Sequence, residues 1–158
     1  MQRPTGRLLR VDLASGRIAV EDIRPDWLRD YLGGRGLAAR YLYAELDPQV
    51  DPLSPANKLI FATGPLTGTP VPCGARYMVV TKGALTNAIT TSNSGGHWGP
   101  ELRFAGYDMV IDEGRAPTPV YLYIYHDHVE LRDAEAYWGQ AVGATEDVRI
   151  RRIPRYWS

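Results

Sequence analysis

Short apolar runs of four to six residues recur along this chain, separated by turn residues. Its 158 residues include 16 glycines and 12 prolines, which close one run after another. Runs of this length between turn residues are typical of β-strands. We predict strands at residues 8–13, 17–21, 58–63, 77–81, 87–92, 108–112, 120–125 and 129–132.

Helical patterns occur only as single segments between these runs. Pro25-Asp26 opens one helix, and Gly33-Gly34 ends it. A second helix is predicted at 37–46 and a third at 97–104. Because regular alternation of strand and helix is missing, the sequence predicts an α+β fold and not a doubly wound parallel sheet.

The composition argues against several classes of partner. Hydrophobic residues make up 44% and charged residues 23%, as in ordinary globular domains, and the length suits one domain. The 18 basic and 18 acidic residues cancel, so the whole chain gives no indication of binding to nucleic acid or to an anionic membrane. We also expect no signal peptide and no membrane-spanning segment.

The chain has a single cysteine, Cys73. It can form neither an intrachain disulfide nor a thiolate metal site of its own. No neighbouring residue in the sequence marks a base that would activate it. A reducing, cytoplasmic compartment is therefore the expected location.

The most informative polar segment contains Asn93-Ser94-Gly95-Gly96. A predicted strand runs here into a glycine-bearing turn that opens a helix. Free backbone amides and glycines in such a turn let a phosphate or a pterin amide approach closely. The same pattern is typical of Asn93 or Ser94 acting only as a helix cap, and the residues alone leave both interpretations open.

Arg76 is the second candidate, because it stands between small residues and the strand at 77–81. A guanidinium in such a place can present its planar fork to a flat, anionic cofactor. For this residue taken alone, a surface salt bridge is the favoured interpretation.

Two further patterns lie in the predicted hairpin near the C-terminus. His126 and His128 fit an exposed turn, and a metal site there would need a third ligand from elsewhere. Tyr121, Tyr123 and Tyr125 alternate with aliphatic residues, which predicts a strand packed on both faces.

The basic tail at 149–158 fits a frayed chain end, with stacking on nucleic acid as the alternative.

Several short motifs occur together in one order, and that order resembles the N-terminal domain of the aldehyde ferredoxin oxidoreductase family. The resemblance covers residues 6–139, and residues 140–158 are predicted to be a divergent or truncated tail. The motifs are Tyr31-Leu-Gly-Gly-Arg-Gly-Leu-Ala38, Asp51-Pro-Leu-Ser-Pro-Ala-Asn-Lys58, Gly64-Pro-Leu-Thr-Gly68, Gly74-Ala-Arg-Tyr77, Asn93-Ser-Gly-Gly96 and Phe104-Ala-Gly-Tyr-Asp108.

The resemblance implies a base of two β-sheets with a few inserted helices, incomplete at the C-terminal end, that cradles a tungsten bis-pterin cofactor or its molybdenum form. Arg76 would lie against the pterin, between it and a [4Fe-4S] cluster. Asn93 would offer its backbone carbonyl to a magnesium ion that bridges the pterin phosphates. Gly95 would allow close backbone contact, with Ser94 and Gly96 beside it, and no residue of the chain is expected to be catalytic.

The chain departs from the family pattern at positions outside these motifs. The cysteines that bind the cluster and the later pterin-binding segments of the family have no counterpart here. Residues 81–86 read Thr-Lys-Gly-Ala-Leu-Thr where the family usually has Thr-Lys-Ser-Pro-Leu-Thr.

Three hypotheses follow from this comparison. The chain is an N-terminal oxidoreductase domain that is inactive alone, a standalone module that binds the pterin cofactor, or a split subunit that pairs with a chain carrying the missing domains. Ferredoxin would be a partner of the complete enzyme only. Strand surfaces left uncovered by the missing domains predict either self-association into a homo-oligomer or marginal stability.

Overall fold

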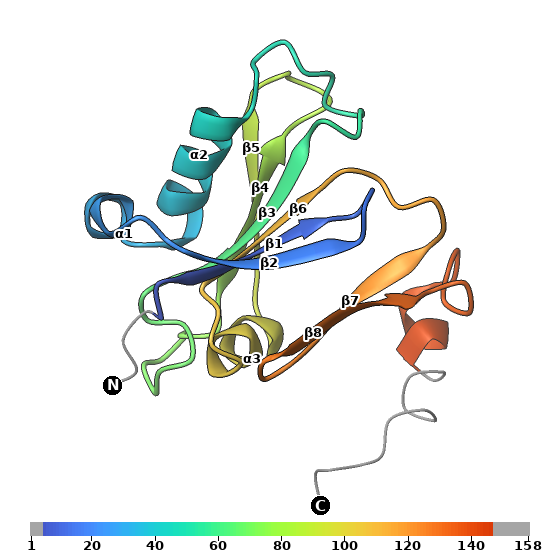
Figure 1. Cartoon of the computed structure of the whole chain (residues 1–158). Helices are drawn as coiled ribbons and strands as arrows, with labels where there is room; N and C mark the ends of the chain where they lie inside the picture. The colour runs from blue at the N-terminus through green and yellow to red at the C-terminus, as the bar shows by residue number, and fades with distance from the viewer. Residues whose placement is uncertain (1–4, 147–158) are drawn as a thin grey trace, which may run out of the picture.

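The computed structural model describes residues 5–146 of the chain. In chain order the elements of this part are β1 Arg7–Asp12, β2 Arg17–Asp22, α1 Pro25–Tyr31, α2 Gly34–Glu45, β3 Lys58–Thr63, β4 Tyr77–Lys82, β5 Ile89–Ser94, α3 Trp98–Phe104, β6 Met109–Glu113, β7 Val120–Tyr125 and β8 His128–Asp133 (Figure 1). The predicted α+β class is confirmed.

Two sheets organise the fold, as predicted. The larger has six strands in the order β2-β1-β6-β3-β4-β5, and the smaller is the β7–β8 hairpin. Within the large sheet only β1 and β6 run parallel, and every other neighbouring pair is antiparallel. β5 is an edge strand whose residues 89–93 are all exposed, so neither of its faces is covered within the described chain.

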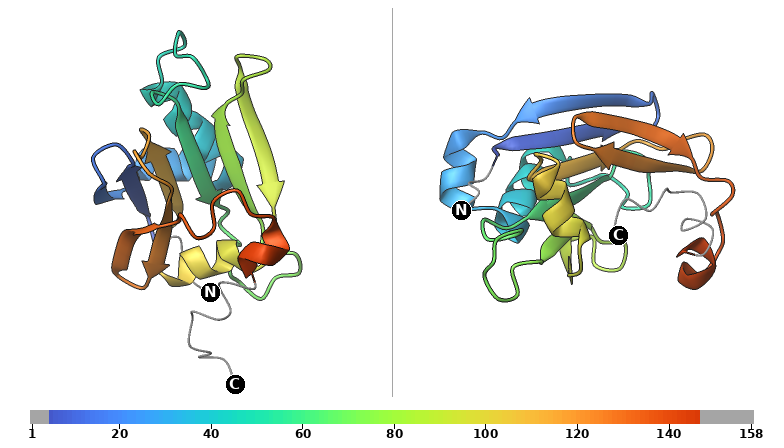
Figure 2. Two further views of the ribbon diagram at one scale, coloured as in Figure 1. Left: turned by 90° about the vertical axis from the view of Figure 1, so that its right-hand side faces the viewer. Right: turned by 90° about the horizontal axis from the view of Figure 1, so that it is seen from below.

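The large sheet is covered on both faces, and each face has its own core. α1 and α2 pack on one face, whereas α3 and the β7–β8 hairpin lie on the other (Figures 1 and 2). The buried members of the first core are Leu8, Ile23, Leu37, Ala38, Tyr41, Leu42, Ile60, Ala62, Val80, Met109 and Ile111. Those of the second are Leu9, Val11, Leu102, Tyr107 and Val110.

A cluster of charged side chains joins the C-terminal end of α2 to the sheet. Arg10 Nε lies 2.8 Å from Glu21 Oε1, and Arg10 Nη1 lies 2.9 Å from Glu45 Oε2. Lys58 contacts both Glu45 and Glu113. The hydrogen bond to Glu45 is the largest cause of a raised pKa for Arg10, although partial burial opposes it. These contacts hold α2 at its far end, which leaves its glycine-rich start to face the site described below.

Two predicted elements are misplaced by two residues or more, and both lie near that site. α2 begins at Gly34, three residues before the predicted start, because Leu32, Gly33 and Gly34 all take positive φ angles and turn the chain at once into a new helix. β5 spans Ile89–Ser94 and not 87–92, because its register is set by pairing with β4 and not by an apolar pattern of its own.

The tyrosines of β7 lie on the outer face of the hairpin. Leu122 and Ile124 pack into the second core, but Tyr121 is 36% exposed and Tyr125 is 61% exposed. The interpretation of this strand as packed on both faces is therefore wrong for the described chain.

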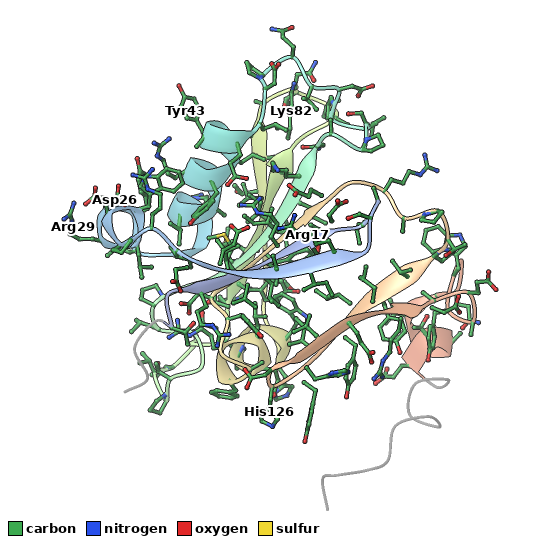
Figure 3. All side chains as sticks on the ribbon, viewed as in Figure 1. Arg17, Asp26, Arg29, Tyr43, Lys82 and His126 are labelled. Atoms are coloured by element: carbon green, nitrogen blue, oxygen red, sulfur yellow. The ribbon has the colours of Figure 1, made fainter. Side chains whose placement is uncertain are left out.

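His126 forms the turn between β7 and β8, as the side-chain view shows (Figure 3), and residues 5–146 contain no group of three or more His, Cys, Asp or Glu side chains placed to hold a metal ion.

The division at residue 139 stays a prediction, and the basic tail at 149–158 lies outside the described residues. Among residues 5–146, no helix has both the length and the apolar character needed to cross a bilayer.

Asp112 supplies a test of the packing on the second face. It pairs with Val11 and Leu59 in the middle of the sheet, and within residues 5–146 its carboxylate has no hydrogen-bond donor. Burial raises the pKa of Asp112 to about 6. The folded chain therefore holds this proton more tightly than the unfolded chain, so the free energy of unfolding should fall as the pH rises from about 4 to 6.

Asp112→Asn removes this titration. Relative to the wild type, the variant should gain on the order of 2 kcal/mol in free energy of unfolding between pH 4 and pH 7. Urea denaturation at the two pH values measures the difference. Asp127→Asn, in the exposed hairpin turn, is the control for loss of a carboxylate. If the difference in free energy of unfolding between Asp112→Asn and wild type is the same at both pH values, Asp112 is not desolvated.

Candidate functional site

A shallow hollow of about 240 Å³ lies on the face of the sheet that carries α2. It is bounded by the start of α2, the loop that follows β3 and the segment that leads into β4. The lining residues are Gly34, Gly64, Pro65, Leu66, Thr67, Cys73, Gly74, Arg76 and Met78. Three glycines, a proline and a methionine make most of its floor smooth and apolar, and Arg76 provides its positive charge.

The Arg76 side chain is exposed, and a side chain of β5 holds its guanidinium in place. Arg76 Nη1 donates a hydrogen bond of 2.8 Å to Asn93 Oδ1, and Asn93 Nδ2 donates to Met78 Sδ at 3.0 Å. Within residues 5–146 Arg76 forms no ion pair, so the surface salt bridge considered from the sequence has no partner there. The fork is oriented by a neutral amide, which leaves its charge uncompensated by the described chain.

Asn93 and Ser94 do not cap a helix. Both belong to β5, whereas α3 begins at Trp98 and has His97 at its N-cap position, without a side-chain cap bond. The free amides at the start of α3 are therefore those of Trp98 and the residues after it, and not those of the Asn93–Gly96 segment. Strand, turn and helix follow one another as predicted, but the interpretation of Asn93 or Ser94 as the helix cap is wrong.

Three of the five predicted site residues come together, and two stand apart. A Cβ atom added to Gly95 would lie 3.7 Å from Cδ and Nε of Arg76, so Gly95 leaves the guanidinium uncovered. Ser94 follows Asn93 in the strand and its side chain therefore points to the opposite face. Gly96 takes φ +82° in the turn, with nothing within 4 Å of its Cβ position.

The loop between β3 and β4 is fixed by a buried threonine. Thr67 is 5% exposed, and its Oγ1 accepts a hydrogen bond of 3.0 Å from the Gly64 amide and donates one of 2.7 Å to the Arg76 carbonyl. Gly74 closes the loop: a Cβ there would approach the carbonyl oxygens of Val71 and Leu66 to 2.9 and 3.0 Å. Any larger residue at 74 would force the loop to move.

A buried ion pair lies beneath this loop. Arg103 Nε lies 3.3 Å from Asp108 Oδ1, without hydrogen-bond geometry, and both side chains are almost fully buried. Arg103 Nη1 donates a hydrogen bond of 2.9 Å to the Gly64 carbonyl. Asp108 Oδ2 accepts from the Gly6 amide at 2.7 Å and from Thr5 Oγ1 at 3.0 Å.

Several residues of this site were not predicted from the sequence. Gly34 was interpreted only as part of a helix stop, and Cys73 as inert, yet both line the hollow. Cys73 is exposed and takes φ +63°. In the sequence, Gly34 and Thr67 were indicated only by their places in the family motifs at residues 31–38 and 64–68.

Comparison with known proteins identifies the family. Residues 8–155 match the family described as aldehyde ferredoxin oxidoreductase, N-terminal domain. The chain belongs to this family. It is 55% identical over 141 residues to the tungsten-containing aldehyde ferredoxin oxidoreductase of Pyrococcus furiosus and 54% identical to that of Pyrococcus abyssi. These matches cover 89% of this chain but only 23% of each relative.

Two other relatives have different names. An aliphatic sulfonate oxidoreductase, WOR-like subunit, of Pyrococcus furiosus is 42% identical over 137 residues, which are 85% of this chain and 22% of that protein. The active site complex BamBC of benzoyl coenzyme A reductase, solved with 1,5-dienoyl-CoA, superposes with a TM-score of 0.91 at 41% identity, over 96% of this chain and 23% of that one. The family fold therefore occurs in relatives whose names give different activities.

Loss of the buried Arg103 should destabilise the whole domain. Arg103→Leu leaves Asp108 buried and removes a bond to the Gly64 carbonyl, so the free energy of unfolding should fall by about 3–5 kcal/mol. Arg29→Leu is the matched control, because Arg29 lies at the surface on α1 (Figure 3), where its ion pair is with the exposed Asp30, and its loss should leave stability almost unchanged. Urea denaturation measures both. Equal effects would mean that the Arg103 pair does not anchor the fold.

Proposed function

We propose that this chain forms part of the seat of a tungsten bis-pterin cofactor in an oxidoreductase of the aldehyde:ferredoxin type, with the molybdenum form as the alternative. The observation that carries the proposal is the Arg76 guanidinium, held by Asn93 at the rim of an apolar hollow and left uncovered by Gly95. Membership of the family supports it, as do the relatives named as tungsten-containing enzymes.

The residues of the hollow fit part of such a group. Gly34, Gly64 and Gly74 leave a flat floor, and Pro65 and Met78 offer apolar surface to a planar ring. Sites that enclose a whole drug-sized ligand measure about 300–1,000 Å³. A hollow of about 240 Å³ that is open on one side suits one portion of a larger cofactor, the rest of which another surface would cover.

Within this proposal each residue has a distinct role. Arg76 provides a planar cation for the pterin or its phosphate, a contact that a point charge such as lysine would not reproduce. Gly95 keeps the space above the guanidinium free, with Ser94 and Gly96 in the adjoining backbone. When bound, the cofactor would supply the oxidation–reduction chemistry, and the residues of this chain would hold and orient it.

A magnesium ion at the pterin phosphates is also part of the proposal, with the Asn93 backbone carbonyl as one ligand. Magnesium takes oxygen ligands from proteins and commonly completes its shell with phosphates and water. β5 is an edge strand, so the carbonyls on its outer side have no strand partner in the described chain. Asn93 would then serve twice, by its side chain to Arg76 and by its backbone to the ion.

Electron transfer is assigned to other parts of the enzyme. The chain contributes one thiolate at most, that of Cys73, whereas a [4Fe-4S] cluster is held by four cysteines. The cluster, the contact with ferredoxin and the catalytic residues would therefore belong to segments outside these 158 residues. We place the assembly in the reducing cytoplasm, and the exposed edge of β5 makes association between copies of the isolated chain an expected consequence.

A split arrangement is the second candidate. One relative is named a subunit, and the similar solved structure is a complex, so domains of this family occur in multi-chain assemblies. In that case the chain would pair with a partner that carries the cluster-binding domains. A standalone pterin-binding module is the remaining alternative, and tight pterin binding by the isolated chain would favour it.

The isolated chain should not oxidise aldehydes. With viologen or ferredoxin as acceptor, the homogeneous chain should show no turnover above buffer, because it has no means to relay electrons from the cofactor. The assay uses the chain purified from cells that make the cofactor, with the full-length relative from Pyrococcus furiosus as positive control. Turnover by the chain alone would exclude the seat-only function.

Substitutions in the seat should change cofactor retention in a defined order. Arg76→Ala and Gly95→Val should each lower the tungsten and pterin content per protein about tenfold, the effect of losing roughly 1.4 kcal/mol of binding. The first removes the cation and the second covers it. Asn93→Ala should lose less of the cofactor, because the proposed carbonyl ligand remains and only the hydrogen bond that orients Arg76 is removed.

The experiment compares metal and pterin content after expression in the native host, in the protein or complex that contains this chain. Arg35→Ala is the control, because Arg35 is an exposed arginine near the hollow that does not line it. Equal cofactor content in Arg76→Ala, Gly95→Val and Arg35→Ala would show that the hollow holds no part of the cofactor.

A further inference from the structure

We infer that Thr67 is a positioning residue for Arg76. Its buried hydroxyl links the backbone of Arg76 to the loop end that the Arg103–Asp108 ion pair holds, and this link keeps the exposed guanidinium in place. The consequence of this positioning for cofactor binding rests on the proposed function, whereas the positioning of Arg76 itself does not. Thr67 lines the hollow, but its hydroxyl is engaged with the Gly64 amide and the Arg76 carbonyl, so that it acts through the backbone of Arg76.

The first step concerns the backbone from which the Arg76 side chain extends. Arg76 is exposed, and a long side chain at such a position ordinarily samples many rotamers. Here its carbonyl accepts the 2.7 Å hydrogen bond from Thr67 Oγ1, and its guanidinium donates the 2.8 Å bond to Asn93. The side chain is thus held at both ends, and Thr67 holds the end nearer the backbone.

The second step concerns what fixes Thr67 itself. Its Oγ1 also accepts the 3.0 Å bond from the Gly64 amide, so a single hydroxyl joins the two ends of the loop. The Gly64 carbonyl in turn receives the 2.9 Å bond from Arg103, which is 4% exposed. A continuous series of contacts therefore runs from Asp108 through Arg103, Gly64 and Thr67 to Arg76.

The third step separates the hydroxyl from the rest of the side chain. Thr67 Cγ2 packs against Gly99 of α3, where an added Cβ would lie 3.3 Å away. Valine retains this branched shape and removes only the hydroxyl, whereas serine retains the hydroxyl and removes the methyl group. The pair Thr67→Val and Thr67→Ser therefore distinguishes positioning through hydrogen bonds from simple packing.

Thr81 supplies a matched control at the opposite end of β4. Its Oγ1 accepts a bond of 3.1 Å from Asn57 and donates one of 2.7 Å to the Lys58 carbonyl, the same pattern of one accepted and one donated bond as Thr67. Thr81→Val should lower the free energy of unfolding by an amount comparable to Thr67→Val, without changing the position of the Arg76 side chain.

The test uses nuclear magnetic resonance of the chain, with the side-chain amide signals of Asn93 as reporter of its bond to Arg76. In Thr67→Val these signals should shift toward their positions in Arg76→Ala, where the bond is absent. In Thr67→Ser and Thr81→Val they should stay at the wild-type positions. Methyl signals of the core confirm in each case that the variant is folded.

Unshifted Asn93 signals in folded Thr67→Val, or an equal shift in Thr81→Val, would overturn the inference. If Thr67→Val fails to fold, Thr67→Ala with Thr67→Ser as its rescue gives the same comparison. Cofactor content is measured separately and should be several-fold lower in Thr67→Val than in Thr67→Ser. Shifted Asn93 signals with unchanged content would support the positioning role and contradict the proposed cofactor seat.

Discussion

The buried Arg103–Asp108 ion pair is the interaction on which the geometry of the site depends. Burying two charges is costly unless each also finds further partners, and here both do. The Asp108 carboxylate accepts a hydrogen bond from the Gly6 amide, and the Asp108 backbone carbonyl accepts one from the Thr63 hydroxyl. Arg103 donates a hydrogen bond to the Gly64 carbonyl. The pair thus joins α3, the start of β6, the end of β3 and the N-terminal segment at one point. The loop that forms the hollow begins directly above that point, so its shape follows from a charge interaction inside the domain.

The sequence predicts the sheets well because their strands carry the apolar pattern themselves. β3 and β7 lie at the predicted residues 58–63 and 120–125, where hydrophobic runs are bounded by turn residues. β5 was misplaced by two residues because Ile89–Ser94 is mostly polar, and such a strand takes its position from its partner. α2 was started too late because glycine pairs usually end helices, whereas positive φ angles at Gly33 and Gly34 allow one helix to follow another immediately.

The site shows a different limit of prediction from sequence. Arg76, Asn93 and Gly95 were singled out from local pattern and from the family motifs. The structure joins Arg76 to Asn93 by a hydrogen bond and places an added Cβ at Gly95 within 3.7 Å of Arg76, while their role toward a cofactor stays a prediction. Thr67 and Arg103 were missed because their importance lies in contacts with residues far away in the sequence, such as the 39-residue separation between Arg103 and Gly64. A buried arginine in a predicted helix looks like an exposed one until the fold is known.

The most direct test of the proposed cofactor seat is to titrate the isotope-labelled chain with a soluble pterin phosphate and magnesium, and to follow the backbone amide signals. The account predicts that the shifts concentrate in the hollow and its rim, at Gly34, residues 64–67, residues 73–78 and residues 93–96, and that Arg76→Ala abolishes them. Shifts confined to another surface, such as the outer tyrosine face of the β7–β8 hairpin, or shifts that persist unchanged in Arg76→Ala, would contradict it.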